Sequence, residues 1–361
     1  MVNGPRLRHE LDGIPAYKAG QPPTLRPGLR AFKLSSNENH HDPLPSVVAA
    51  IGASLDTLHR YPDYGSGDLV RAIATHFCVP EEHVSVGTGS VALLQQLIQI
   101  TADPDSGVLF AWRSFEAYPI MTQIAGAWQQ RVALDASDRH DLDAMFAAID
   151  DRTRLIMVCN PNNPTSTAVD GPALEAFLDA VPPDILVVLD EAYREFVNPQ
   201  VVPDGLELYR NRPNVAVLRT FSKAYGLAGL RVGFCVAHEP VAEALRKVQL
   251  PFGVSTMAQV AAVASLRHES ELLVRVDRIV AERERVMRAL RAVGLTPAES
   301  EANFVWLRLG SASTGFADAC DEAGLSVRPF ENEGVRITIG EPEANTRFMD
   351  VATSWAGRRT A

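Results

Sequence analysis

One lysine stands in an apolar, glycine-rich stretch where a charged side chain is costly to keep. Lys223 lies in residues 220–233, TFSKAYGLAGLRVG. Desolvation disfavours the ammonium form, so a lysine in such surroundings loses its proton more easily than an exposed one. The neutral amine can form a Schiff base with a carbonyl compound. Taken alone, Lys223 also fits an ordinary solvated loop lysine, so its chemistry depends on the residues around it.

A carboxylate ends another apolar run, and two hydrogen-bonding residues accompany it. Asp190 closes LVVLD, where a carboxylate calls for a cationic partner. A protonated pyridine nitrogen is such a partner, and the carboxylate would keep the ring an electron sink. Asn163 and Tyr193 can both hydrogen-bond a phenolic oxygen on the same ring, which favours its anion. A helix cap or structural salt bridge for Asp190 and ordinary turn chemistry for Asn163 stay open as alternatives.

A third group of residues suits a phosphate. Ser90 begins an expected helix, whose free N–H groups and dipole favour an anion, and the Arg231 guanidinium adds bidentate hydrogen bonds. The stretch GTGS is not a nucleotide signature, because Ala92 stands where the third glycine belongs. The expected anion site consists of Arg231, Ser222, Thr220 and the backbone of Ser90 and Val91. These residues together suit one ligand, pyridoxal 5'-phosphate. It carries an aldehyde, a pyridine nitrogen, a phenolic oxygen and a phosphate.

The elements that must position these residues are strands followed by polar clusters. Continuous apolar runs occupy residues 83–87, 107–112, 154–160, 185–191 and 215–221, and 233–237 is a further candidate strand. Such runs are typical of strands buried on both faces of a mainly parallel sheet, and their alternation with helical patterns indicates an α/β fold. The polar clusters at 89–90, 160–166, 190–193 and 220–223 follow four of these runs. The carboxyl ends of parallel strands are where such folds build their sites.

The chain changes character near Leu250. Apolar residues between 272 and 293 recur at helical spacing, and Gly294 is expected to cap that helix. Short strands are expected at 303–309, 324–330 and 334–340. We therefore expect an N-terminal arm over 1–42, which contributes to the small domain and the substrate site. A large cofactor-binding domain over 43–250 and a small α+β domain over 251–361 follow it.

Composition excludes several classes of protein. The 361 residues carry a formal net charge of -10, which argues against a nucleic-acid or anionic-membrane binder. No run approaches the roughly 18–20 apolar residues of a membrane span, and the N-terminus lacks the apolar core of a signal peptide. The cysteines form no zinc pattern and are expected to be free, mostly buried thiols: Cys78, Cys159, Cys235 and Cys320. We expect a cytoplasmic protein without a metal site.

The motifs NPNNPTS, LDEAY and FSKAYGLAGLRVG, in that order, resemble those of the fold-type I aminotransferases. More narrowly, they resemble the branch of histidinol-phosphate aminotransferases and actinobacterial aromatic amino acid aminotransferases. The resemblance runs from KLSSNEN near residue 33 to GVRITIG near 340. It implies a mainly parallel seven-stranded sheet, bound pyridoxal phosphate and a homodimer with shared active sites.

The resemblance also implies roles at matching positions. Lys223 would bind the cofactor's aldehyde and move the proton at the substrate's α carbon, and Asp190, Asn163, Tyr193 and the anion site would act as described above. Phe115 would stack on the ring, or else be a core aromatic. The remaining implied residues are Tyr61 at the neighbouring subunit's phosphate, Arg336 and Asn163 at the substrate, and Tyr17 and Asn37 closing over it or merely packing the arm.

The sequence departs from the family pattern in two places. Ser166 ends NPNNPTS where glycine is common, which is tolerable if the turn needs no positive φ there. His40 and His41 replace the usual continuation of NEN. We interpret them as solvated residues or specificity elements rather than metal ligands, because no third ligand is evident.

The expected function is amino transfer from an aromatic amino acid to a 2-oxo acid such as 2-oxoglutarate, with ping-pong kinetics. WRSFEAY, GSVALLQQL and SVRPFENEGVR resemble the aromatic branch. Arg328, a second basic residue close to Arg336, would suit a phosphate-bearing substrate and keeps histidinol phosphate open as an alternative. A decarboxylase of a phosphorylated amino acid and a non-catalytic cofactor carrier are further alternatives.

Overall fold

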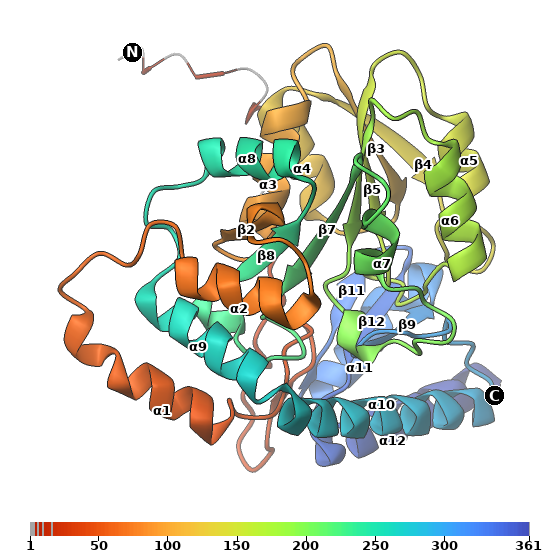
Figure 1. The fold of residues 1–361 in the computed structure, drawn as a ribbon. Helices are drawn as coiled ribbons and strands as arrows, with labels where there is room; N and C mark the ends of the chain where they lie inside the picture. Colours follow the sequence, from red (N-terminus) through yellow and green to blue (C-terminus); the bar gives the residue numbers. More distant parts are fainter. Residues whose placement is uncertain (1–3, 6, 9–10, 16, 361) are drawn as a thin grey trace.

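The computed structural model describes the chain except for residues 1–3, 6, 9–10, 16 and 361. Its centre is a seven-stranded sheet in the order β2-β8-β7-β6-β5-β3-β4 (Figure 1). All neighbouring pairs are parallel except those that β8 makes with β2 and β7. The strands are β2 (Val84–Gly87), β3 (Gly107–Trp112), β4 (Trp128–Ala133), β5 (Thr153–Cys159), β6 (Leu186–Asp190), β7 (Val215–Thr220) and β8 (Gly233–Val236). The expected mainly parallel α/β sheet is confirmed.

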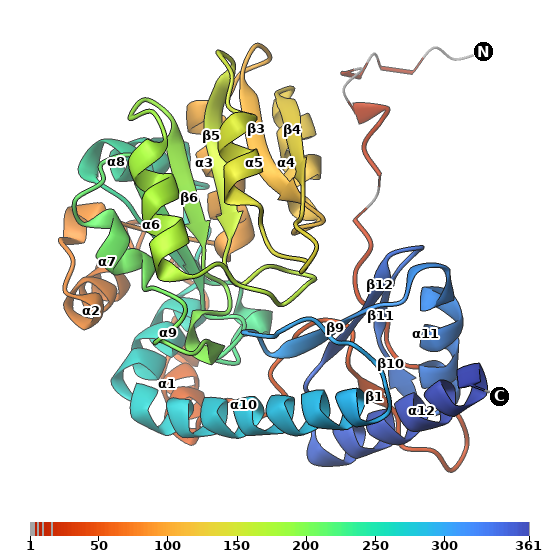
Figure 2. The same ribbon diagram turned by 90° about the vertical axis from the view of Figure 1, so that its right-hand side faces the viewer.

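Helices cover both faces of this sheet (Figure 2), because its strands are apolar on both. Along β3, Val108 and Phe110 pack into one buried cluster, whereas Leu109 and Ala111 pack into the other. The first cluster is covered by α3 (Ser90–Thr101), α4 (Ala117–Ala125) and α8 (Glu239–Val248). The second is covered by α2 (Gly67–Phe77), α5 (Leu142–Ala147), α6 (Gly171–Ala180) and α7 (Gly205–Tyr209). Both faces thus contribute to a buried core around the strands that carry the polar clusters.

The C-terminal part adds a smaller layer against the carboxyl ends of these strands. An antiparallel sheet of order β11-β12-β9 packs with long helices that run along one end of the molecule (Figures 1 and 2). Gly294, with φ +79°, follows α10 as the expected cap. These elements are α9 (Thr256–Arg267), α10 (Glu269–Ala292), β9 (Phe304–Arg308), α11 (Ser313–Glu322), β11 (Arg328–Phe330), β12 (Gly334–Thr338) and α12 (Pro342–Thr360).

The N-terminal arm is attached to this smaller layer. β1 (Phe32–Lys33) pairs in parallel with β10 (Leu325–Ser326), and α1 (Pro45–Ala53) then packs against α9. The division into domains at residues 42 and 250 stays a prediction. No helix in the described ranges is both long and apolar enough to cross a bilayer. Single 3₁₀ turns complete the chain: η2 (Leu55–Thr57), η3 (Glu81–His83), η4 (Arg194–Phe196), η5 (Ala228–Leu230) and η6 (Gly310–Ala312).

Candidate active site

A cavity of about 270 Å³ lies at the carboxyl ends of β5, β6 and β7, closed from the other side by β11, β12 and the arm. It brings together every site residue expected from the sequence except Tyr61. The walls contain Lys223, Asp190, Tyr193, Asn163, Arg231, Ser222, Thr220, Ser90, Val91, Phe115, Arg336, Arg328, Asn37 and Tyr17. Residues far apart in the sequence therefore meet in one polar cavity.

Lys223 is partly buried and has no ion-paired carboxylate among the described residues. Its Nζ donates to the Ser36 carbonyl oxygen at 3.3 Å. Burial, together with the positive charges of Arg336 and Arg231, lowers the pKa of Lys223 to about 7. A large share of the amine is therefore uncharged near neutral pH, which is the form that reacts with a carbonyl group.

Asp190 presents one free carboxylate oxygen to the cavity. The Tyr118 hydroxyl donates to Oδ2 at 2.8 Å, while the buried Oδ1 has no hydrogen-bond partner in the part of the chain described. Burial raises the pKa of Asp190 to about 6. An unpartnered buried carboxylate oxygen is costly, and a cationic N–H donor in the cavity would satisfy it.

Two further pairs line the same wall. The Asn37 side-chain amide donates to the Tyr193 hydroxyl at 3.0 Å. Arg336 donates to Asn163 Oδ1 at 2.6 Å and to the Ser35 carbonyl at 2.7 Å. Arg336 is 9% exposed, and no described carboxylate forms an ion pair with it. A buried guanidinium held only by neutral oxygens can bind a carboxylate of a ligand.

The expected anion site is compact. The Arg231 guanidinium donates to Ser222 Oγ at 3.3 Å, and the Ser222 backbone N–H donates to Thr220 Oγ1 at 3.1 Å. A Cβ atom at Gly233 would lie 2.6 Å from the Ser90 nitrogen, so only glycine lets β8 approach the start of α3. The helix N-terminus, the hydroxyls and the guanidinium converge as a phosphate requires.

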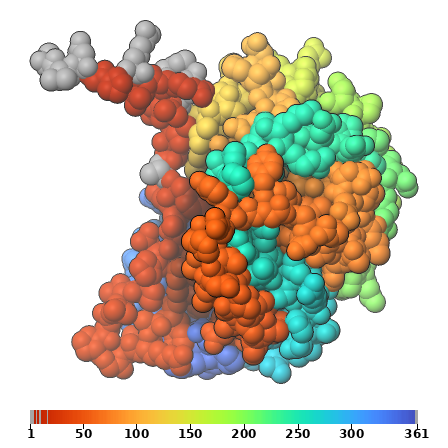
Figure 3. Space-filling view, turned by 60° about the vertical axis from the view of Figure 1, so that its left-hand side comes forward, coloured from red at the N-terminus to blue at the C-terminus, as the bar shows by residue number. Residues whose placement is uncertain are grey.

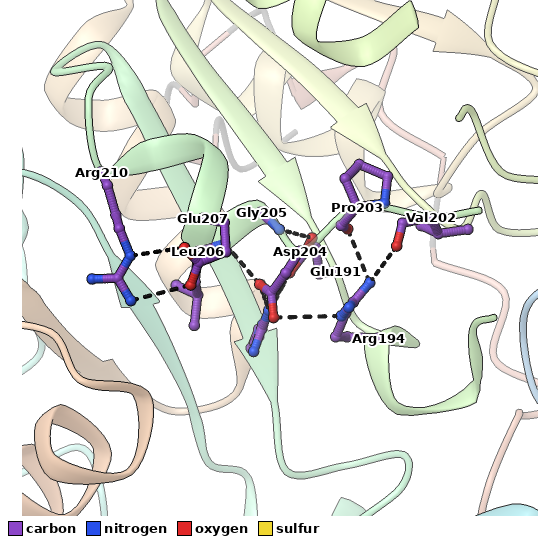
Figure 4. Close-up of polar contacts among 10 residues, drawn as sticks. Glu191, Arg194, Val202, Pro203, Asp204, Gly205, Leu206, Glu207 and Arg210 are labelled. Carbon is purple, nitrogen blue, oxygen red and sulfur yellow. Dashed lines mark hydrogen bonds and ion pairs between the residues drawn. The ribbon is translucent and has the colours of Figure 1, made fainter. Parts of the chain in front are cut away.

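Behind these residues lies a buried ion pair that sequence reasoning missed. Arg219 donates to Glu191 Oε2 at 2.7 Å, and both side chains are 4% exposed. Arg219 also pairs with Asp204, which lies beside Glu191 and Arg194 (Figure 4). Because successive strand residues point to opposite faces, this pair faces away from the cavity while the adjacent Asp190 and Thr220 face into it.

A second ion pair stands in the cavity wall. Arg328 donates to Glu116 Oε2 at 2.9 Å, with side-chain exposures of 11% and 28%. Arg328 lies directly across from Arg336 in the register of β11 and β12, so the expected proximity of the two arginines is confirmed. Glu116 was not singled out from the sequence, although it lies within WRSFEAY.

The structure corrects one expectation and qualifies another. Ser166 has φ +63°, so the turn does need a positive φ, and the condition under which serine would be tolerable there is not met. Its backbone is fixed by a hydrogen bond from the Glu301 N–H to the Ser166 carbonyl at 2.8 Å. The rings of His40 and His41 are in contact, with centroids 4.1 Å apart and planes tilted by 37°. Both are partly buried and outside the cavity walls, so neither is fully solvated nor positioned to contact a ligand there.

Tyr61 lies outside the walls of this cavity as far as the described residues define them. Its side chain is 81% exposed and stacks on Phe252 with ring centroids 4.6 Å apart. A role at a neighbouring subunit's phosphate stays a prediction, because a single chain does not test it.

The chain is similar to known aminotransferases in both sequence and structure. Residues 30–351 match the family model described as aminotransferase class I and II. The chain is 60% identical over 348 residues to the aromatic amino acid aminotransferase of Streptomyces coelicolor, covering 96% of this chain and 97% of the relative. It is 56% identical to the aromatic amino acid aminotransferase of Thermobifida fusca, covering 98% of both chains. A crystal structure of histidinol-phosphate aminotransferase from Sinorhizobium meliloti in complex with pyridoxal-5'-phosphate superimposes with a TM-score of 0.87 at 27% identity, covering all of both chains.

Proposed function

Because the chain belongs to the class I and II aminotransferases, we propose that it transfers the amino group of an aromatic amino acid to a 2-oxo acid. Phenylalanine, tyrosine and tryptophan are the proposed donors, and 2-oxoglutarate is a proposed acceptor. The names of the relatives from Streptomyces coelicolor and Thermobifida fusca support this assignment. The observation that carries it is the charge balance of the cavity: Arg336 has no acidic partner among the described residues, whereas Arg328 is neutralised by Glu116.

The residues present fit pyridoxal 5'-phosphate. The free Asp190 Oδ1 suits the pyridine N–H, and the lowered pKa of Lys223 suits attachment to the aldehyde. Arg231, Ser222 and the start of α3 would hold the phosphate. When bound, the cofactor supplies a ring that stabilises negative charge on the substrate's α carbon.

The chain's own residues would transfer the proton and hold the ring in place. The Lys223 amine is the group that takes and returns the proton at the substrate's α carbon, and its low pKa keeps it available as a base near neutral pH. The Tyr118 hydroxyl donates to Asp190 Oδ2 and leaves Oδ1, which would accept from the ring nitrogen. Asn163 and Tyr193 would hydrogen-bond the ring oxygen, and Phe115 would cover one ring face.

Substrate binding follows from the two arginines. Arg336 would bind the α-carboxylate, which matches one unneutralised guanidinium with one negative charge. Histidinol phosphate has no carboxylate, and its phosphate ester carries up to two negative charges. A second positive charge beside Arg336 would suit it, and it would have to compete with Glu116 for Arg328. The arm residues Tyr17 and Asn37 would close the cavity over the bound substrate.

We also propose a homodimer with shared active sites in the cytoplasm. The described part of the arm extends beyond the body of the molecule (Figure 3), and its apolar side chains are exposed: Leu7 at 72%, Leu11 at 43% and Leu25 at 84%. With the exposed Tyr61, these residues suit burial against a second copy of the chain.

The test is a half-reaction. The purified, cofactor-loaded protein is mixed separately with phenylalanine and with histidinol phosphate, and loss of the cofactor's absorbance is followed in time. We expect fast bleaching by phenylalanine. Fast bleaching by histidinol phosphate, at a much lower concentration than phenylalanine requires, would replace the aromatic assignment with a histidinol-phosphate aminotransferase.

A further inference from the structure

Glu116 and Arg328 form an ion pair inside the substrate region of the cavity. Glu116 comes from the loop before α4, on the large sheet's side, and Arg328 comes from β11 on the opposite wall. Their 2.9 Å contact joins the two parts of the cavity wall, and both side chains stay partly exposed, Glu116 at 28% and Arg328 at 11%. A ligand can therefore reach both partners.

The two arginines of this wall differ in what neutralises them. Arg336 contacts the Asn163 amide and the Ser35 carbonyl, which carry no net charge. Arg328 is its direct cross-strand neighbour but contacts a carboxylate. The wall therefore offers one uncompensated positive charge rather than two.

We infer that Glu116 determines substrate specificity by occupying Arg328, so that the site favours side chains without negative charge. This inference rests on the proposed function, since it takes Arg336 as the partner of the α-carboxylate. The surroundings agree with it, because the Arg328 guanidinium lies 5.4 Å from the ring centroid of Phe330, and Phe115 lines the same cavity. An aromatic side chain meets apolar rings and a neutral ion pair there. The acidic side chain of a 2-oxo acid such as 2-oxoglutarate must displace Glu116 from Arg328 before it can bind as the acceptor.

The test measures binding to the cofactor-loaded enzyme with two unreactive probes. Both 3-phenylpropionate and glutarate carry one carboxylate at the position of the α-carboxylate and lack the amino group. They differ at the far end, which is a phenyl ring in one and a second carboxylate in the other. Dissociation constants are obtained from the change in cofactor absorbance and from calorimetry.

Glu116→Gln keeps the shape of the side chain and removes its charge. We expect glutarate to bind about tenfold more tightly, because charge-assisted hydrogen bonds to a freed guanidinium are strong, and 3-phenylpropionate to change by less than about threefold. In Glu116→Gln combined with Arg328→Gln the gain for glutarate should vanish. Glu116→Met is a second uncharged variant in case the amide folds poorly.

The matched control is Glu333→Gln. Glu333 pairs with Arg113 between the same two parts of the chain but does not contribute to the described cavity walls, so the ratio of the two dissociation constants should stay at the wild-type value. The inference is overturned if that ratio is unchanged in Glu116→Gln, if the gain persists without Arg328, or if Glu333→Gln reproduces it. Failure of wild type to react with phenylalanine would instead overturn the proposed function, and the binding ratios would still separate the two results.

Discussion

Two arginine–glutamate pairs of this molecule differ in burial and therefore in what they can do. Arg219 and Glu191 are each 4% exposed and face away from the cavity. Arg328 and Glu116 have similar geometry but stand in the cavity wall, partly exposed. A sealed pair cannot exchange partners without leaving a charge in an apolar interior, so it holds neighbouring residues in place. An accessible pair contributes little to stability and can exchange its partner for a ligand.

Breaking the sealed pair should have the largest effect. Arg219→Met leaves Glu191 and Asp204 without their shared partner, and we expect a loss of about 3–5 kcal/mol in the free energy of unfolding. Urea unfolding of the cofactor-loaded protein measures it. A loss in unfolding free energy below about 1 kcal/mol would mean that the Arg219–Glu191 pair contributes no more to stability than an exposed pair does.

Lys223 extends the comparison to a partly buried amine that has no ion-paired carboxylate among the described residues. Its pKa falls from 10.5 to about 7 in the folded chain, so the unfolded state binds its proton more tightly. The stability of the cofactor-free protein should therefore rise between about pH 7 and 10. At pH 7, Lys223→Met should stabilise the cofactor-free protein by about 2–4 kcal/mol.

Thermal unfolding of both cofactor-free proteins across this pH range tests the expectation. The difference between Lys223→Met and wild type should shrink as the pH approaches 10. A difference independent of pH would show that the lysine's charge is not responsible.

Breaking the accessible pair should cost much less. Arg328→Met should change the free energy of unfolding by no more than about 1 kcal/mol. The same urea titration, run beside Arg219→Met, measures both. Equal losses in the two variants would erase the distinction between the pairs.

The smallest effect concerns backbone strain rather than charge. Ser166 adopts φ +63°, which favours glycine, whereas glycine also makes the unfolded chain more flexible. Because these contributions oppose each other, we expect Ser166→Gly to change the unfolding free energy by less than about 1 kcal/mol. A larger loss would indicate that the buried Ser166 hydroxyl, which donates to the Thr165 carbonyl, matters more than the backbone.

The sequence predicted elements and residues whose signal is local. Strands buried on both faces were found from their apolar runs, whereas β4, WQQRVA, was missed because this edge strand is largely polar and exposed. The polar residues of the cavity at the strand ends were found because they follow those apolar runs directly in the sequence. Tyr118 and Glu116 were missed although they stand in a quoted motif, because their partners lie 72 and 212 positions away. Such pairings exist only once the chain has folded.

The attachment of the N-terminal arm to the C-terminal layer has a consequence for biosynthesis. The Asn37 N–H donates to Thr338 Oγ1, 301 positions further on, and the neighbouring Ser35 and Ser36 carbonyls contact Arg336 and Lys223. At roughly 5–20 residues per second, a ribosome needs roughly 15–60 s to make the intervening chain. The first part of the site to be synthesised must therefore wait for the last, and a chain released early would lack the strand that holds the arm.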